Sequence, residues 1–157
     1  MVERNRYDLG LVFASPRMAD KNAVRLHSAH AVAAMAPGHR LAGHSVITPS
    51  DLIDERVLIP GRNSPLRLSL DRAFSREEHQ PVSTMETSML TGCHFVATGM
   101  GVGIVDHTSL RSADADVISI PFEPSIEVSY FAIRPSGGRR IAILHEIINR
   151  IQRLIQN

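Results

Sequence analysis

Short apolar runs alternate along this chain with segments whose apolar residues recur at helical spacing, and this alternation strongly constrains the fold. Residues 57–59 form one such run, and Leu66, Leu70, Ala73 and Phe74 follow it with the period of an α-helix. The loops that lead from predicted strands to predicted helices are rich in Gly, Ser, Thr and Pro. The sequence therefore predicts an α/β fold with a mostly parallel sheet.

Helix ends are marked by residues suited to capping. Ser64 suits the N-cap of the first long helix, and Thr87 or Ser88 suits that of the next. Gly99 is placed to end the second helix in a left-handed conformation. Strands are predicted at residues 8–13, 31–35, 57–59, 81–85, 102–105, 117–120 and 127–133, and helices at residues 65–74, 89–96 and 141–155, with a short helix from Pro49 after the cap Thr48.

The length and composition suit a small globular protein. The 157 residues fit one domain or two small lobes, and 43% of them are hydrophobic, so a core can form without disulfides or metal. The single cysteine, Cys93, excludes a disulfide within the chain. No apolar run approaches the roughly 20 residues of a membrane span, and no secretory signal is visible. We therefore expect a cytoplasmic protein that does not insert into a membrane.

The charge pattern does not indicate nucleic-acid binding by this chain. The net charge is +1, from 17 basic and 16 acidic residues, without a run of five basic residues. Aromatic residues make up 4% and tryptophan is absent, which argues against stacking platforms for single-stranded nucleic acid or sugars.

Signatures of catalysis are weak. The glycines within residues 99–103 follow a helix and enter a strand, the reverse of a dinucleotide fingerprint, and predict a tight connection. Cys93 lies on the apolar stripe of its helix, which favours an inert packed thiol over a nucleophile paired with His94. We expect no cofactor, no catalytic residues and no metal, with the histidines at positions 27, 30, 39, 44, 79 and 94 not converging.

Polar residues lie where predicted strands lead into helices. Arg62, Asn63 and Ser64 precede one helix, and Thr87 and Ser88 precede another. Ligands of open α/β sheets bind at the carboxyl ends of strands, and helix N-termini there suit a carboxylate. The alternative is that these residues only cap their helices.

Four stretches, in this order along the chain, resemble the effector-binding domain of LysR-type transcriptional regulators. They are residues 8–12 (DLGLV), 35–42 (MAPGHRLA), 48–52 (TPSDL) and 95–105 (FVATGMGVGIV), with Arg40 in place of the family's usual proline. The second and third stretches look most like the opine- and amino-acid-responsive members.

The resemblance implies a type 2 periplasmic-binding-protein-like fold, with two Rossmann-like lobes and an effector in the cleft between them. Lobe I would comprise residues 1–29 and 121–157, and lobe II residues 30–120, with crossovers near residues 24–28 and 118–121. The expected ligand contacts are Ser15 from lobe I and, from lobe II, Arg62, Asn63, Ser64, Thr87 and Ser88.

Two departures from the family pattern concern the N-terminal side. The family's winged helix-turn-helix is not in this chain, so DNA contact would depend on a part the chain lacks, and lobe I is expected to be incomplete. Exposed sheet edges recruit partners, and the family pairs these domains, so we expect a homodimer or higher oligomer.

Other functions of the same fold stay open. A transport-type solute-binding protein would need a signal peptide. A bilobal enzyme would need a catalytic acid or a cofactor-attaching cysteine in the cleft. A buried Cys93 would argue against an enzyme that attaches its cofactor to a cysteine.

Overall fold

The computed structural model describes residues 7–17, 22–76, 81–134 and 142–156. The chain divides into two compact units, which we call unit 1 (residues 1–28 and 128–157) and unit 2 (residues 29–127). Strand β2 (Ala23–Met35) begins in unit 1 and ends in unit 2. The division into lobes at residues 29/30 and 120/121 stays a prediction.

Unit 2 is built on a mixed sheet. Its strands run in the order β2, β5 (Val102–Asp106), β3 (Arg56–Pro60) and β4 (Ser83–Thr87), with β6 (Ile118–Pro121) on the other side of β2. Strand β3 is parallel to both β4 and β5, whereas β2 is antiparallel to β5 and β6. The prediction of a mostly parallel sheet is therefore right for β3, β4 and β5 and wrong for the strands around β2.

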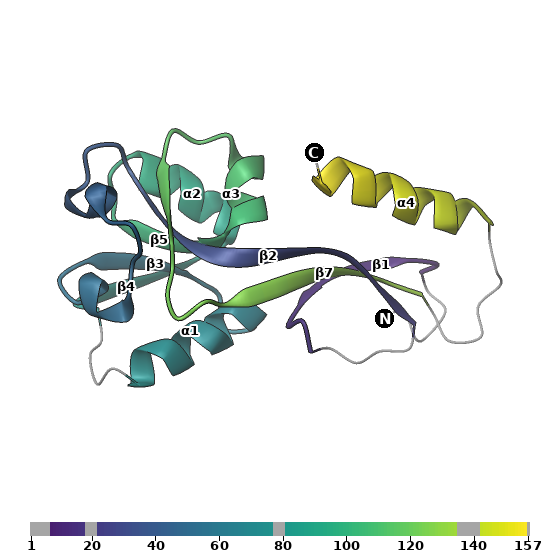
Figure 1. Cartoon of the computed structure of the whole chain (residues 1–157), viewed down its shortest axis with the longest axis horizontal. Helices are drawn as coiled ribbons and strands as arrows, with labels where there is room; N and C mark the ends of the chain where they lie inside the picture. The colour runs from purple at the N-terminus through teal and green to yellow at the C-terminus, as the bar shows by residue number, and fades with distance from the viewer. Residues whose placement is uncertain (1–6, 18–21, 77–80, 135–141, 157) are drawn as a thin grey trace. The chain divides into compact units, whose positions relative to one another are not determined.

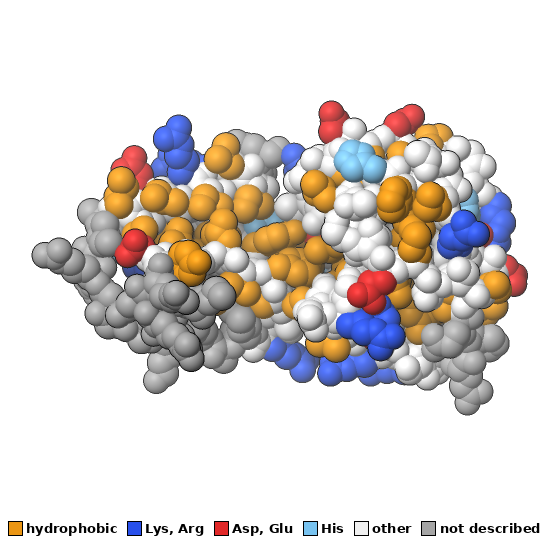
Figure 2. Space-filling view, turned by 180° about the vertical axis from the view of Figure 1, so that it is seen from behind, with side chains coloured by type: hydrophobic (Ala, Val, Ile, Leu, Met, Phe, Trp, Pro, Cys, Tyr) orange, Lys and Arg blue, Asp and Glu red, His pale blue; other side chains and the backbone are white. Residues whose placement is uncertain are grey.

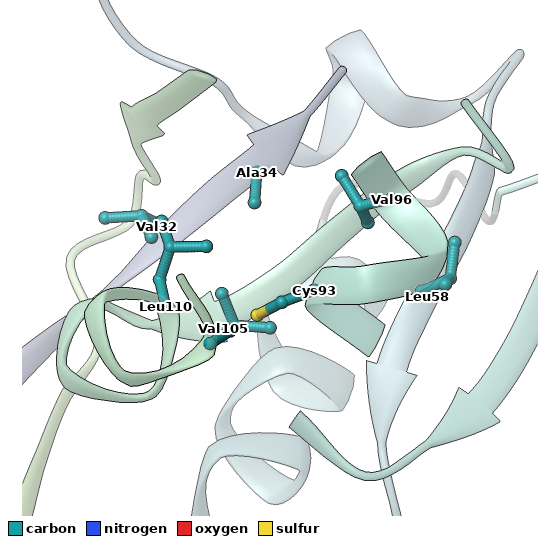
Figure 3. Close-up of a cluster of buried hydrophobic side chains, with 8 residues drawn as sticks. Val32, Ala34, Leu58, Cys93, Val96, Val105 and Leu110 are labelled. Carbon is teal, nitrogen blue, oxygen red and sulfur yellow. The ribbon is translucent and has the colours of Figure 1, made fainter. Parts of the chain in front are cut away.

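Helices cover both faces of this sheet (Figure 1). Helices α2 (Met89–Ala97) and α3 (His107–Ala113) lie on one face, and α1 (Pro65–Arg76) lies on the other. Apolar side chains from the sheet, from α2 and from α3 pack together in one core (Figure 3), whose buried members are Val32, Ala34, Leu58, Cys93, Val96, Val105, Leu110 and Ala113.

The connection from β2 to β3 contains two short 3₁₀ helices, η2 (Arg40–Gly43) and η3 (Pro49–Leu52). The second confirms the predicted short helix, and Thr48 shares a capping box with Asp51. The first was not predicted from the sequence. Arg40, at the position where the family usually has proline, donates a hydrogen bond of 2.7 Å to Glu55.

Unit 1 combines strand β1 (Gly10–Ala14) with strand β7 (Glu127–Ile133) in an antiparallel pair, and β7 neighbours β2. The Ser28 and Ser129 hydroxyls, one from each of these neighbouring strands, are 2.9 Å apart. Helix α4 (Ala142–Gln156) packs on the sheet through Ile148, which contacts Leu26 and Ala132. The predicted C-terminal helix is confirmed over this range.

Other differences between the predicted and the observed elements concern strand ends and one helix, and β1 starts two residues after the predicted residue 8. Strand β2 starts eight residues before the predicted residue 31, and β4 is shifted by two residues from the predicted 81–85. Helix α3 was missed, because among its seven residues only Leu110 and Ala113 are buried. No helix in the described ranges is both long and apolar enough to cross a membrane.

Candidate functional site

The carboxyl ends of β3 and β4 meet at one edge of the unit 2 sheet. Pro60, the last residue of β3, pairs in register with Thr87, the last residue of β4. Helix α1 begins five residues after Pro60, and α2 begins two residues after Thr87. Because the two strands are parallel, both helices start at the same edge, which is where ligands of open α/β sheets bind.

Ser64 occupies the N-cap of α1 without using its hydroxyl to cap. Its amide donates to the Gly61 carbonyl at 2.8 Å, and its carbonyl accepts from the Leu68 amide at 3.2 Å, which is the first helical hydrogen bond. The Ser64 Oγ is buried, and no described group forms a hydrogen bond with it. The interpretation of Ser64 as an ordinary side-chain cap is therefore wrong. A buried hydroxyl without a partner costs free energy, and such groups often have a functional explanation.

Ser88, in contrast, is an ordinary cap. Its hydroxyl accepts a hydrogen bond from the Thr91 amide at 3.1 Å and donates one to the Thr91 hydroxyl at 2.8 Å. The sequence left open whether Thr87 or Ser88 caps α2, and the structure shows that Ser88 does. Thr87 ends β4, and its methyl group lies so close to α2 that a Cβ on Gly92 would be 3.0 Å from it. The predicted convergence of the Ser64 and Thr87 hydroxyls on one site stays a prediction.

Arg62 and Asn63 are exposed in the loop between β3 and α1. Arg62 was predicted to pair with a carboxylate, and its Nε lies 3.9 Å from Oε2 of Glu86 in β4. Sequence reasoning missed Glu86. Local pattern did not indicate Glu86, because it neighbours the predicted contact Thr87 along β4 and so points to the opposite face of the sheet.

Arg67 in the first turn of α1 was also missed. Its Nη1 donates to the Pro60 carbonyl at 3.1 Å and to the Glu86 carboxylate at 3.3 Å, and its Nε donates to Asp71 at 2.7 Å. The Arg67 side chain is 12% exposed. These contacts join the start of α1 to the ends of β3 and β4, so Arg67 holds the edge together.

Asp106 belongs to the neighbouring strand β5 and is fully buried. One of its carboxylate oxygens accepts from the amides of Thr108 and Ser109, each at 3.0 Å, which caps α3. The other oxygen accepts from the Ser109 hydroxyl. Asp106 therefore balances the positive end of the α3 dipole, whereas the first turns of α1 and α2 contain no acidic residue of their own.

Ser15 lies in unit 1, directly after β1, and is exposed. Its hydroxyl accepts from the Arg17 amide at 3.5 Å. The assignment of Ser15 as a ligand contact stays a prediction.

Cys93 is free and buried in the core between the sheet and α2 (Figure 3). Burial raises the pKa of its thiol, and the nearby Asp106 charge raises it further. A thiol in this environment is a poor nucleophile. Within the described residues, no three His, Cys, Asp or Glu side chains are grouped as metal ligands would be, and His79 lies outside those residues.

Charged side chains are dispersed on the face shown in Figure 2, where several Lys or Arg side chains lie beside Asp or Glu. This arrangement agrees with the near-zero net charge of +1.

The chain is similar to curated bacterial regulators. It is 30% identical over 149 residues to the transcriptional activator protein LysR of Escherichia coli (strain K12), a match that covers 94% of this chain and 48% of LysR. It is 29% identical over 140 residues to the regulatory protein NocR of Agrobacterium tumefaciens (strain T37), covering 88% of this chain and 47% of NocR. The chain thus spans about half the length of these relatives.

The fold also matches solved structures. The CcmR regulatory domain of Synechocystis PCC6803, in complex with 2-PG, superposes with a TM-score of 0.74 at 20% identity, covering 99% of this chain and 77% of that one. This likeness shows the type 2 periplasmic-binding-protein-like fold. The family described as LysR substrate binding domain matches residues 1–156. The chain belongs to the LysR substrate binding domain family.

Proposed function

We propose that this chain is the ligand-sensing part of a LysR-type transcriptional regulator and that it binds a small carboxylate-bearing effector. The binding site is the edge of unit 2 where α1 and α2 begin, and units 1 and 2 correspond to the family's lobes I and II. The observation that carries the proposal is the Ser64 hydroxyl, which is buried and unpartnered at the N-terminus of α1.

A carboxylate suits this edge for electrostatic reasons. The unpaired amides at helix N-termini and the positive ends of two helix dipoles favour an anion. Arg62 adds an accessible positive charge, because its side chain is 84% exposed and its Nε lies 3.9 Å from Oε2 of Glu86. The Ser64 hydroxyl supplies a donor whose burial is costly until a ligand accepts from it.

Binding regulates only if the effector prefers one arrangement of the protein over another. We place this sensing in the cytoplasm and in a homodimer or higher oligomer, without catalysis. The support is the relation to LysR and NocR, whose names describe regulators, and the inert environment of Cys93. The amino-acid or opine character of the effector rests on the resemblance of residues 35–42 and 48–52 to the opine- and amino-acid-responsive members of the family.

A thermal-shift screen tests the proposal. The purified chain is mixed with small carboxylates, including amino acids and opines, and separately with their methyl esters. A carboxylate that binds raises the unfolding midpoint. At a free concentration of 100 times its dissociation constant, it raises the free energy of unfolding by about 2.7 kcal/mol. The methyl ester of the same compound serves as the matched control, since it lacks the charge. Equal shifts with acid and ester, or no shift with any acid, would contradict the proposal.

A further inference from the structure

Glu86 places a negative charge at the edge where the proposed function puts an effector carboxylate. Its side chain is 50% exposed and stands at the end of β4, opposite Ile59 in β3. A Cβ on Gly61 would be 3.4 Å from its Oε1, so the loop that leads to Ser64 passes close to the Glu86 carboxylate. Glu86 and the start of α1 therefore belong to one local environment.

The positive charges nearby compensate Glu86 only in part. Its distances to Arg67 Nη1 and Arg62 Nε are 3.3 and 3.9 Å, longer than the roughly 2.7–2.9 Å of a strong charge-assisted hydrogen bond. Arg67 is also engaged with Asp71 and the Pro60 carbonyl. The half-exposed Glu86 side chain can therefore accept hydrogen bonds from a further cationic donor.

An effector with a carboxylate alone would meet repulsion from Glu86 at this edge. An effector that also carries an ammonium group beside its carboxylate would meet two complementary partners. Its carboxylate would face the α1 N-terminus, Arg62 and the unpartnered Ser64 hydroxyl, and its ammonium group would face Glu86. Like charges brought together at a binding site cost affinity, and this cost is a common source of specificity.

We propose that Glu86 is a specificity-determining residue that selects effectors of the α-amino-acid class, with adjacent carboxylate and ammonium groups. This inference rests on the proposed function and deepens it. Arg67 acts as a positioning residue, because it holds the Glu86 carboxylate at the edge without being free to bind the ligand.

The test compares each of the twenty L-amino acids with its N-acetyl derivative, which keeps the carboxylate and loses the ammonium charge. Affinities are measured by thermal shift and calorimetry on the 157-residue chain, on Glu86→Gln and on Glu127→Gln, a matched change at another exposed glutamate. We expect at least one free amino acid to bind at least tenfold tighter than its N-acetyl form. Glu86→Gln should remove that preference by weakening the free amino acid alone, and Glu127→Gln should leave it unchanged.

The outcomes separate this inference from the proposed function. If carboxylates without an amino group bind as tightly as amino acids, or if Glu86→Gln keeps the preference, the role of Glu86 is overturned and the proposed function stands. If no carboxylate of either kind binds, both are overturned. A Glu86→Gln variant that weakens both ligand classes equally would show a merely structural effect and would also overturn the inference.

Discussion

Gly103 in β5 lies directly beneath Val96 of α2, so closely that a β-carbon at position 103 would be 2.8 Å from Val96 Cγ2. This contact lets α2 approach the sheet and bury Cys93 and Val96 completely. The close approach explains why a glycine stands in the middle of a fully buried strand, where glycine otherwise weakens the structure.

We expect Gly103→Ala to lower the free energy of unfolding by about 1–3 kcal/mol, the usual cost of overpacking a core. The combination with Val96→Ala should recover part of that loss, because the second change removes the clashing methyl groups. Gly43→Ala is the control, since a Cβ there meets nothing within 4 Å. Urea unfolding measures the free energy of unfolding of all variants. A Gly103→Ala variant as stable as the original chain would refute the close contact between Gly103 and Val96.

The two serines before α1 and α2 should respond differently to alanine. Ser88→Ala removes a helix cap and should lower the stability of the ligand-free chain by about 1 kcal/mol. Ser64→Ala removes a buried hydroxyl without a partner and should leave that stability unchanged or raise it, while it weakens effector binding by about 1 kcal/mol or more. Thr87→Ala should weaken binding similarly.

Thermal unfolding measures the stability of these variants, and calorimetry measures their affinity for whichever carboxylate the screen identifies. A Ser64→Ala variant that binds the effector as well as the original chain would contradict the assignment of Ser64.

Asp51 should make stability depend on pH in the acid range. Its carboxylate accepts from the Thr48 amide at 2.8 Å and from the Thr48 hydroxyl at 2.7 Å. The amide hydrogen bond is the largest cause that holds the pKa of Asp51 below its ordinary value, against an opposing effect of burial. Because the pKa is lower in the folded state, the ionised carboxylate stabilises the fold above the ordinary aspartate pKa, and this contribution is lost as the pH falls through the folded-state value.

We therefore expect Asp51→Asn to be less stable than the original chain at pH 7, by about 1 kcal/mol. The difference should shrink as the pH falls below about 4, where the carboxyl becomes protonated. Urea unfolding at several pH values measures the difference, with Asp54→Asn as the control at a neighbouring exposed aspartate. A difference that stays constant with pH would show that Asp51 acts through something other than its charge.

Cys93 should be unreactive in the folded protein. Its thiol is buried and burial raises its pKa, so little thiolate exists at neutral pH and reagents cannot reach it. A thiol-specific reagent such as Ellman's reagent should label Cys93 slowly in buffer and rapidly in denaturing urea. Rapid labelling of the folded chain would mean that the packing between α2 and the sheet opens easily.

Self-association should depend on apolar residues of unit 1. Hydrophobic side chains gather on the surface around β1 and α4 (Figure 2), and Leu11, Ile143, Ile147 and Leu154 are exposed by 62%, 59%, 38% and 72%. Apolar patches of this kind often mark protein–protein interfaces. We expect the chain to sediment as a dimer or larger species, and Ile147→Lys to raise the monomer fraction. A clean monomer at high concentration would refute this.

The candidate site shows which of its features could be predicted from residue types alone. The pair Ser64-Pro65 indicated the start of α1, and the structure confirms a helix from Pro65. Whether the Ser64 hydroxyl would cap or remain unpaired could not be read from the sequence, because that depends on which side chains and amides surround it. Glu86 was missed for the same reason, since Arg67 lies 19 residues earlier in the chain.

The sequence by itself determined the order of the strands and of the helices other than α3 and η2, because burial periodicity, caps and glycines act within a few residues. Local pattern could not decide the antiparallel pairing around β2 or the register that sets Pro60 beside Thr87. Strand direction and register are chosen by contacts between distant segments, where the hydrophobic faces and backbone hydrogen bonds of whole strands must match at once. The tertiary structure alone therefore brought Arg62, Ser64 and Glu86 to one edge of the sheet.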